Sequence, residues 1–200
     1  MASARSSRNV PRSIRACLLE SARVHTDTAT SQGRTIARAA ALMSTAMRGG
    51  RKIIWFGNGG SATQSQHMAA EFVGRFLRER RSLPSISLAE NMASVTAIGN
   101  DYDYESIFAR QLEGLGRRGD VAVGLSTSGS SPNVLAGLRK AKAMGLATIG
   151  LTSAKGRRMQ PLCDICIMVP SMETARIQEA HLTIGHVLCG LVEDALTSPR

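Results

Sequence analysis

Two segments of the chain share one pattern: an apolar run that predicts a buried strand, then a turn of small residues, then a helix. The first turn is Gly57-Asn58-Gly59-Gly60-Ser61, and the second is Ser126-Thr127-Ser128-Gly129-Ser130-Ser131. Both turns place backbone N–H groups at a helix start, where unpaired donors and the positive end of the helix dipole favour an anion. The pattern therefore predicts a phosphorylated small molecule as ligand.

Strands and helices alternate along the rest of the chain. Apolar runs predict strands at 52–57, 85–88, 121–126, 147–152 and 163–169, and helical periodicity predicts helices at 13–26, 33–47, 61–77, 91–99, 104–115, 131–144 and 173–196. Ser61 is the expected N-cap of the third helix, and Asn100-Asp101 is expected in a polar turn. This alternation predicts an α/β fold: a three-layer sandwich with a mostly parallel five-stranded sheet, whose ligands bind at the carboxyl ends of the strands.

The length of 200 residues suits one domain. Residues 1–15 carry four arginines without a following apolar stretch, so we expect a disordered basic arm and not a secretory signal. Residues 16–197 are then a single domain. The chain has no apolar run long enough to span a bilayer, and we expect a cytoplasmic protein without a membrane partner.

The net charge of +10 raises the question of nucleic-acid binding. The basic residues are spread along the chain, and aromatic residues make up only 4%, too few for a base-stacking surface. Neither a zinc finger nor an RNA-binding sheet motif is present. We therefore expect no nucleic-acid partner, and the positive charge favours small anionic ligands.

Cys163 and Cys166 have the CxxC spacing, but they lie in an apolar run that predicts a strand, with no second Cys or His pair nearby. A thioredoxin-like motif opens a helix instead. Reduced, buried cysteines are therefore expected.

Two groups of polar residues on helices are candidates for chemistry. His67 and Glu71 are four residues apart and share one helix face, as a surface pair or as a metal-binding or acid–base pair. On the last helix, Glu179 and His186 face the same side, while Gln178 and His186 are about 80° apart. A structural hydrogen-bond cluster is the alternative there, and spacing alone does not select Gln178.

Taken together, five motifs resemble the phosphoheptose isomerases, which are sedoheptulose 7-phosphate isomerases of the sugar isomerase (SIS) fold. The motifs are Gly57-Asn58-Gly59-Gly60-Ser61, His67-Met-Ala-Ala-Glu71-Phe-Val-Gly-Arg75-Phe, Thr96-Ala-Ile-Gly-Asn100-Asp101, Ser126-Thr127-Ser128-Gly129, and Arg176-Ile-Gln178-Glu179-Ala-His181 with His186. They occur in order, with fitting spacing, over nearly the whole chain after about residue 15.

The resemblance implies a homotetramer with active sites at subunit interfaces, into which the N-terminal helices extend. It implies one Zn²⁺ per subunit, with the ligands His67, Glu71, Gln178 and His186. The substrate contacts that it implies are Asn58, Gly59, Gly60, Ser61, Asn100, Asp101, Ser126, Thr127, Ser128, Ser131 and Gln178. Ser130 and Pro132 are given no role.

The expected reaction converts sedoheptulose 7-phosphate to D-glycero-D-manno-heptose 7-phosphate through an enediol, as the first step of nucleotide-activated heptose biosynthesis. Glu71 is the expected proton shuttle and His186 serves the oxygens. A non-catalytic sugar-phosphate-binding protein of the same fold, or one that associates with a replication initiator, is the alternative. Because such proteins lack the acidic and histidine pair, the presence of both Glu71 and His186 favours an enzyme.

Overall fold

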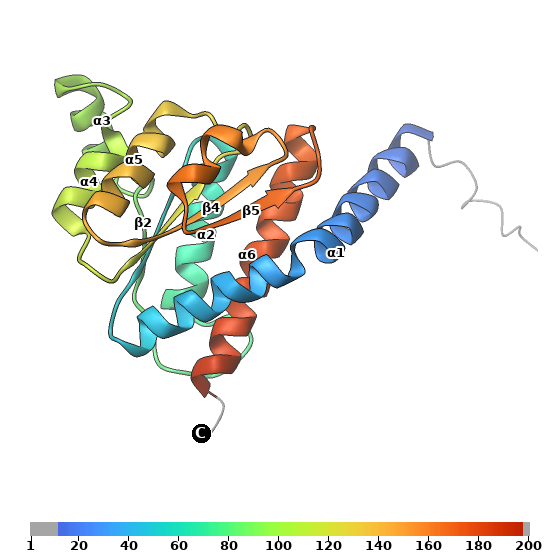
Figure 1. Ribbon diagram of the computed structural model, residues 1–200, viewed down its shortest axis with the longest axis horizontal. Coiled ribbons are helices and arrows are strands. Elements are labelled where there is room, and N and C mark those ends of the chain that lie inside the picture. Colours follow the sequence, from blue (N-terminus) through green and yellow to red (C-terminus); the bar gives the residue numbers. More distant parts are fainter. Residues whose placement is uncertain (1–11, 198–200) are drawn as a thin grey trace, which may run out of the picture.

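The computed structural model describes residues 12–197 as a parallel sheet between two layers of helices (Figure 1). The five strands are β1 (Ile53–Gly57), β2 (Ser85–Ser87), β3 (Val121–Leu125), β4 (Ala147–Ser153) and β5 (Ile165–Val169). They lie in the order β2-β1-β3-β4-β5, and every neighbouring pair is parallel. The predicted three-layer α/β sandwich is confirmed.

Two apolar cores lie on the two faces of this sheet. The helices are α1 (Arg12–Arg48), α2 (Gly60–Val73), α3 (Met92–Asp101), α4 (Ile107–Leu115), α5 (Pro132–Ala143) and α6 (Thr174–Thr197), with 3-10 turns at Gly156–Arg158 and Gln160–Leu162. Trp55 points into the core beneath α1, α2 and α6, and its neighbour Phe56 points into the core beneath α4 and α5. Successive side chains of a strand alternate between faces, so one buried strand supplies both cores.

The N-terminal region is one helix, α1, and not the two helices that the sequence predicts. The break was expected at the polar stretch from Thr26 to Gly33. Hydroxyl side chains in that stretch bond to carbonyls four residues earlier, as in Thr28 Oγ1 to the Val24 oxygen at 2.7 Å, and this is compatible with a continuous helix. Residues 1–11 of the expected basic arm lie outside the described residues, and residues 12–15 are the first turn of α1.

Several element ends differ from the predicted ones. Gly59, not Ser61, is the N-cap of α2, and Ser61 is buried in the first turn. The same helix ends at Val73 rather than near Leu77, and the residues after it turn so that the Phe76 and Leu77 N–H groups bond to Glu193 of α6. Asn91 caps α3 as predicted, and its side chain accepts a hydrogen bond from Ser94 N.

Asn100 and Asp101 lie in the last turn of α3, not in a separate polar turn. Strand β5 begins at Ile165, so Cys163 precedes it and Cys166 lies within it. Both cysteines are half-buried free thiols, and their sulfurs lie against Gly150 of β4. Among residues 12–197, no helix combines the length and the apolar character that a membrane crossing requires.

A buried carboxylate joins β1 and β3 at the edge of the sheet where both strands begin. Asp120 is 1% exposed, and it accepts hydrogen bonds from the backbone N–H groups of Lys52 and Arg117 at 3.0 and 2.8 Å. Lys52 Nζ lies 2.6 Å from the same carboxylate. Three donors therefore satisfy a charge that would otherwise be costly to bury.

Replacing this carboxylate by the amide in Asp120→Asn is expected to lower the free energy of unfolding by about 2 kcal/mol, because the amide turns an N–H toward a donor. Urea denaturation measures the change. The control is Glu105→Gln at the exposed pair Arg139–Glu105, 3.6 Å apart with both side chains 54% exposed, where the loss stays below about 1 kcal/mol. Equal effects in the two variants would contradict this account.

Candidate active site

The two small-residue turns lie side by side because β1 and β3 are neighbours that end at the same edge of the sheet. Gly57 and Leu125, the last residues of these strands, are paired in register. A Cβ atom added to Gly57 would lie 2.9 Å from the carbonyl oxygen of Leu125, so glycine is needed for this close approach. The two predicted ligand-binding turns are therefore one continuous surface.

A reciprocal amide pair joins these turns. Asn58 Nδ2 donates to Asn133 Oδ1, and Asn133 Nδ2 donates back to Asn58 Oδ1, each at 2.8 Å. The hydroxyl of Tyr104 also donates to Asn58 Oδ1 at 3.1 Å. Asn133 is 1% exposed in the first turn of α5. The orientation of the predicted substrate residue Asn58 is thus set by two side chains, Asn133 and Tyr104, that no sequence motif singled out.

Hydroxyl groups gather at the start of α5. The hydroxyl of Ser126 lies 3.0 Å from that of Ser131 and 3.4 Å from that of Ser128. Gly129 N donates to Ser126 Oγ, and Ser153 Oγ donates to the carbonyl oxygen of Thr127. The Ser131 hydroxyl does not cap its own helix. Hydroxyl and backbone donors at a helix start are the arrangement that binds a phosphate group.

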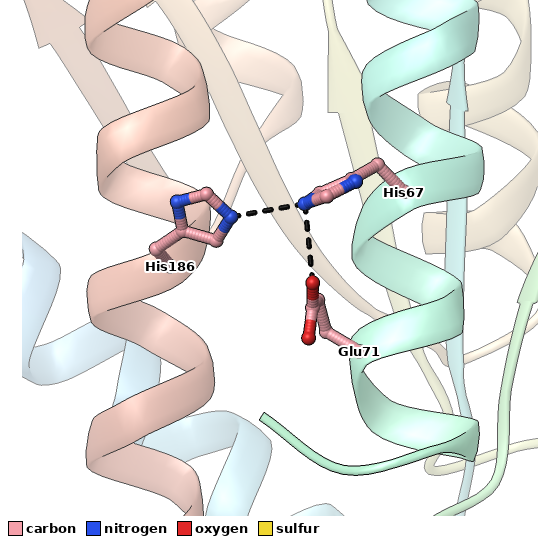
Figure 2. A group of neighbouring side chains, drawn as sticks. All are labelled: His67, Glu71 and His186. Atoms are coloured by element: carbon pink, nitrogen blue, oxygen red, sulfur yellow. Dashed lines mark hydrogen bonds and ion pairs between the residues drawn. The ribbon is translucent and has the colours of Figure 1, made fainter. Parts of the chain in front are cut away.

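The side chains of His67, Glu71 and His186 converge between α2 and α6 (Figure 2). His67 Nε2 lies 2.9 Å from His186 Nε2 and 3.2 Å from Glu71 Oε1. One ligand atom from each of the three residues lies within 4.8 Å of the others. The spacing of four residues thus places His67 and Glu71 together on α2, and the tertiary structure adds His186 from α6.

These three groups fit a divalent metal ion. Imidazole nitrogen and carboxylate oxygen are common zinc ligands. His67 Nε2 contacts both a nitrogen and a carboxylate, and a neutral imidazole has only one proton to donate. A cation could bind one lone pair from each of His67, Glu71 and His186 at the same time.

Close packing of α2 against α6 brings the cluster together. A Cβ added to Gly185 would meet Met68 Sδ, so only glycine fits next to His186. On the other side, the ring of Phe76 stacks on His186 with centroids 5.3 Å apart and an interplanar angle of 9°. The His186 ring is therefore held by packing as well as by its polar neighbours.

Gln178 lies at the other end of the α2–α6 contact. A Cβ on Gly60 would lie 2.6 Å from Gln178 Nε2, so this side chain faces the glycine turn. The carbonyl oxygen of Gln178 accepts a hydrogen bond from Gln64 at 2.7 Å. Eight residues separate Gln178 from His186, a rise of about 12 Å along the helix. Gln178 is thus beside the predicted substrate turn, and its place among the metal ligands stays a prediction.

Comparison with known proteins identifies the family to which the chain belongs. The SIS domain family matches residues 18–153. A phosphoheptose isomerase of Rhodospirillum rubrum is 52% identical over 163 residues, which are 82% of this chain and 87% of that protein. The chain belongs to the phosphoheptose isomerase family.

Solved structures of the family have the same fold. The phosphoheptose isomerase of Neisseria gonorrhoeae superimposes with a TM-score of 0.86 at 35% identity, covering 91% of this chain and 97% of that chain. The phosphoheptose isomerase of Francisella tularensis gives a TM-score of 0.88 at 34% identity with the same coverage. The resemblance stated from the sequence motifs is confirmed.

Asn100 and Asp101, two of the predicted substrate residues, also lie apart from the cluster of His67, Glu71 and His186. They are exposed at the end of α3, where Asn100 Nδ2 donates to Asp101 Oδ1 at 2.9 Å. Figure 1 places α3 on the side of the molecule remote from α6. Their contact with substrate stays a prediction.

The other two polar residues noted on α6 have structural partners. Glu179 accepts hydrogen bonds from Ser21 Oγ of α1 and from Arg176, at 2.7 and 2.6 Å. His181 is 1% exposed and contacts the Thr152 carbonyl oxygen. Burial lowers the pKa of His181 to about 4, against the opposing effect of that hydrogen bond, so the ring is neutral at neutral pH.

The serine turn depends on a glycine in the left-handed region. Gly129 has a φ of 61°, and an added Cβ would lie 2.8 Å from Thr152 Oγ1 and also against Gly156. Gly129→Ala is therefore expected to lower the free energy of unfolding by about 2 to 5 kcal/mol, as strain and overpacking add. Urea denaturation measures the loss.

The matched control is Gly50→Ala, at a φ of 70° with nothing within 4 Å of an added Cβ. Only backbone strain acts there, and the expected loss is about 1 to 2 kcal/mol. If both variants lost the same stability, crowding at the serine turn would be refuted.

Proposed function

We propose that the chain converts sedoheptulose 7-phosphate to D-glycero-D-manno-heptose 7-phosphate, the first step of nucleotide-activated heptose biosynthesis. The supporting observation is the cluster of His67, Glu71 and His186, two of whose members lie on the helix that starts at the first glycine turn. His67 is seven residues from Gly60, a rise of about 10 Å along α2. The substrate carries its phosphate on C7 and reacts at C1 and C2, so its two ends match the two parts of the site.

The protein groups account for both proton movements of this reaction. The Glu71 carboxylate removes a proton from C1 of the ketose, which leaves an enediol, and returns the proton to C2. His186 carries a proton between the oxygens on C1 and C2, so that the C2 carbonyl becomes a hydroxyl and the C1 hydroxyl becomes an aldehyde. Glu71 Oε1 faces His67, and its second oxygen remains for the substrate.

His67, Glu71, Gln178 and His186 would hold one Zn²⁺ per subunit. The ion would polarise the carbonyl and hydroxyl oxygens of the substrate as a Lewis acid. The close contact of two imidazole nitrogens with a carboxylate supports this assignment for the three residues that converge. Gln178 lies two helical turns before His186 on α6, with its side chain against Gly60, and the resemblance alone supports it as the fourth ligand.

The phosphate end of the site would be held by the two turns. Asn58, Gly59, Gly60 and Ser61 follow β1, and Ser126, Thr127, Ser128 and Ser131 follow β3. The gathering of three serine hydroxyls at the start of α5 supports the serine turn as the phosphate seat. The net charge of +10 supports an anionic substrate.

We also propose a cytoplasmic homotetramer with shared active sites. The first turns of α1 extend away from the body of the molecule (Figure 1), and Ile14, Leu18 and Leu19 are 49%, 66% and 59% exposed there. Apolar side chains in such number on one segment are typical of a contact surface. A neighbouring subunit would also explain how Asn100 and Asp101 could reach a substrate.

Replacing the proposed base tests the mechanism. Glu71→Gln is expected to lower kcat by about 100- to 10,000-fold, because the amide cannot take the C1 proton. Sugar-phosphate binding, measured by calorimetry, remains largely intact because the turns are unchanged. Conversion of sedoheptulose 7-phosphate is followed by NMR at saturating Zn²⁺.

Glu79→Gln is the matched control, since Glu79 lies eight residues later and its side chain is 90% exposed. Its turnover should equal that of the wild type. Near-normal turnover of Glu71→Gln would remove Glu71 from the base role, and absence of turnover in the wild type would refute the proposed activity.

Metal uptake tests the ligand set separately. The metal-free protein is expected to bind one Zn²⁺ per chain, and His186→Gln is expected to weaken binding by at least about 100-fold, since even outer partners of metal ligands contribute 10- to 100-fold. His25→Gln is the control, because His25 bonds to Ser21 and Thr183 away from the cluster. Unchanged affinity in Gln178→Ala would remove Gln178 from the ligands.

A further inference from the structure

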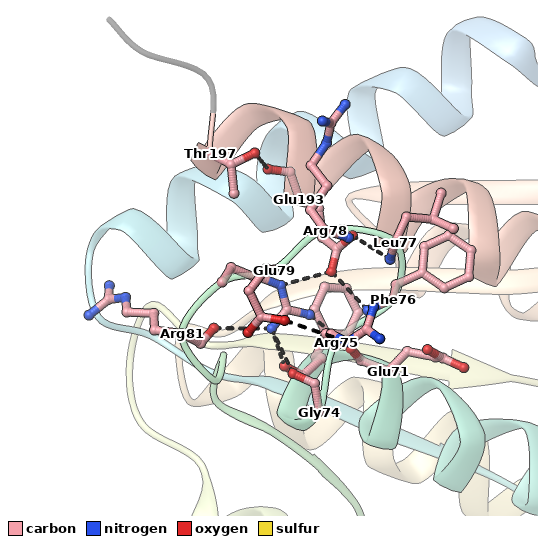
Figure 3. A network of polar contacts seen from close by, with 12 residues as sticks. Glu71, Gly74, Arg75, Phe76, Leu77, Arg78, Glu79, Arg81, Glu193 and Thr197 are labelled. Atoms are coloured by element: carbon pink, nitrogen blue, oxygen red, sulfur yellow. Dashed lines mark hydrogen bonds and ion pairs between the residues drawn. The ribbon is translucent and has the colours of Figure 1, made fainter.

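The segment between α2 and β2 is folded around one buried carboxylate. Glu193 of α6 is 1% exposed and accepts hydrogen bonds from three successive backbone N–H groups (Figure 3). Its Oε1 accepts from Phe76 at 2.9 Å, and its Oε2 accepts from Leu77 and Arg78 at 2.9 and 3.1 Å. These three N–H groups and Arg80 lower the pKa of Glu193 against the raising effect of its burial.

Arg80 completes this arrangement from the opposite side. Its side chain is 4% exposed, and Nε donates to Glu193 Oε1 at 2.9 Å. The remaining guanidinium nitrogens donate to carbonyl oxygens at the end of α2, to Glu71 at 2.8 Å and to Phe72 at 2.9 Å. The last carbonyls of a helix lack partners within it and carry the negative end of its dipole, so a buried cation is well placed there.

The Arg80–Glu193 pair connects both helices of the metal-binding cluster. Arg80 binds the carbonyl of Glu71, one of the three converging residues on α2 and α6. Glu193 is seven residues after His186 and therefore on the same face of α6. Between them, Phe76 is fixed by its N–H bond to Glu193 and stacks on the His186 ring. A chain of direct contacts thus runs from the pair to the ring.

Stability alone gives little reason for this pair. Replacing a buried ion pair by well-packed apolar residues is often neutral or stabilising, because desolvation offsets the attraction. What the charged pair adds is a set of directional hydrogen bonds. The planar guanidinium holds its donors in fixed positions, and the carboxylate orients three N–H groups. The guanidinium and the carboxylate therefore fix the positions of the backbone groups that they bind.

We propose that Arg80 and Glu193, which we call the clamp, are positioning residues. They set the orientation of the His186 ring and the spacing of α2 and α6 for metal binding and proton transfer. The proposal rests on the proposed function for its catalytic part only. Neither residue is among the predicted substrate contacts. Their effect passes through Phe76 and through the backbone of Glu71.

The test uses Glu193→Gln and Arg80→Lys in the full chain. The amide turns an N–H toward backbone donors, and lysine keeps the charge but loses the planar fork. The control is Asp120→Asn, another buried carboxylate that accepts two backbone N–H bonds and pairs with a cation, at the edge of the sheet where the strands begin. All three variants are expected to lose stability.

The first readout is the NMR signal of the His186 ring in the metal-free protein, assigned with His186→Gln. Stacking on Phe76 shifts this signal, and both clamp variants are expected to lose the shift while Asp120→Asn keeps it. Zn²⁺ affinity, by chelator competition, is expected to fall about 10- to 100-fold in the clamp variants alone. At saturating Zn²⁺, kcat falls by a similar factor, and KM stays within about threefold because the phosphate seat is distant.

A lower melting temperature with an unchanged His186 signal and unchanged Zn²⁺ affinity would overturn the proposal and leave the pair a purely structural one. The same conclusion follows if Asp120→Asn disturbs the site equally. If Glu193→Gln does not fold, Arg80→Lys gives the same readouts. If the clamp variants lose the ring shift but the wild type does not isomerise sedoheptulose 7-phosphate, the proposed function is refuted. The positioning role of Arg80 and Glu193 toward His186 would still stand.

Discussion

The close approach of β1 and β3 at their carboxyl ends is the constraint on which the candidate site depends. Gly57 faces the carbonyl of Leu125 at a distance that excludes any side chain, and the turns that follow are consequently in contact. The reciprocal amide pair of Asn58 and Asn133 then locks one turn to the other. A parallel sheet places successive strand ends at one edge, and here two of them form the surface that we propose as the anion seat.

A second constraint lies perpendicular to the sheet, in the packing of α2 against α6. Gly60 and Gly185 allow the two helices to approach, Gln178 fills the space at one end, and His67 meets His186 further along. The buried pair of Arg80 and Glu193 closes the far end. The α2–α6 contact therefore runs from the glycine turn at Gly60 to the cluster of His67, Glu71 and His186. This arrangement suits the proposed substrate, which carries its charge and its reacting carbons at opposite ends.

Much of the fold followed from local patterns. Strand positions and most helix bounds were predicted within a few residues, since apolar runs and helical periodicity act over short distances. The errors fall where tertiary contacts override local signals. The hydroxyl-rich stretch before Gly33 predicts a break, but α1 is continuous there, and the hydroxyls bond to carbonyls of the preceding turn within the helix. Helix α2 ends early at Val73, because Arg80 and Glu193 hold the following residues.

Local patterns along the chain were enough to predict the alternation of strands and helices, the two turns that end β1 and β3, and the pairing of His67 with Glu71, since these depend on neighbours within a few residues. The motif resemblance had already grouped His186 with His67 and Glu71, but local patterns could not, because 119 residues separate His186 from His67. That Asn133 orients Asn58 and that Gln178 faces Gly60 is visible only in the folded chain. These contacts join segments far apart in the chain, and their distances come from how closely helices and strands pack. No periodicity in the sequence contains that information.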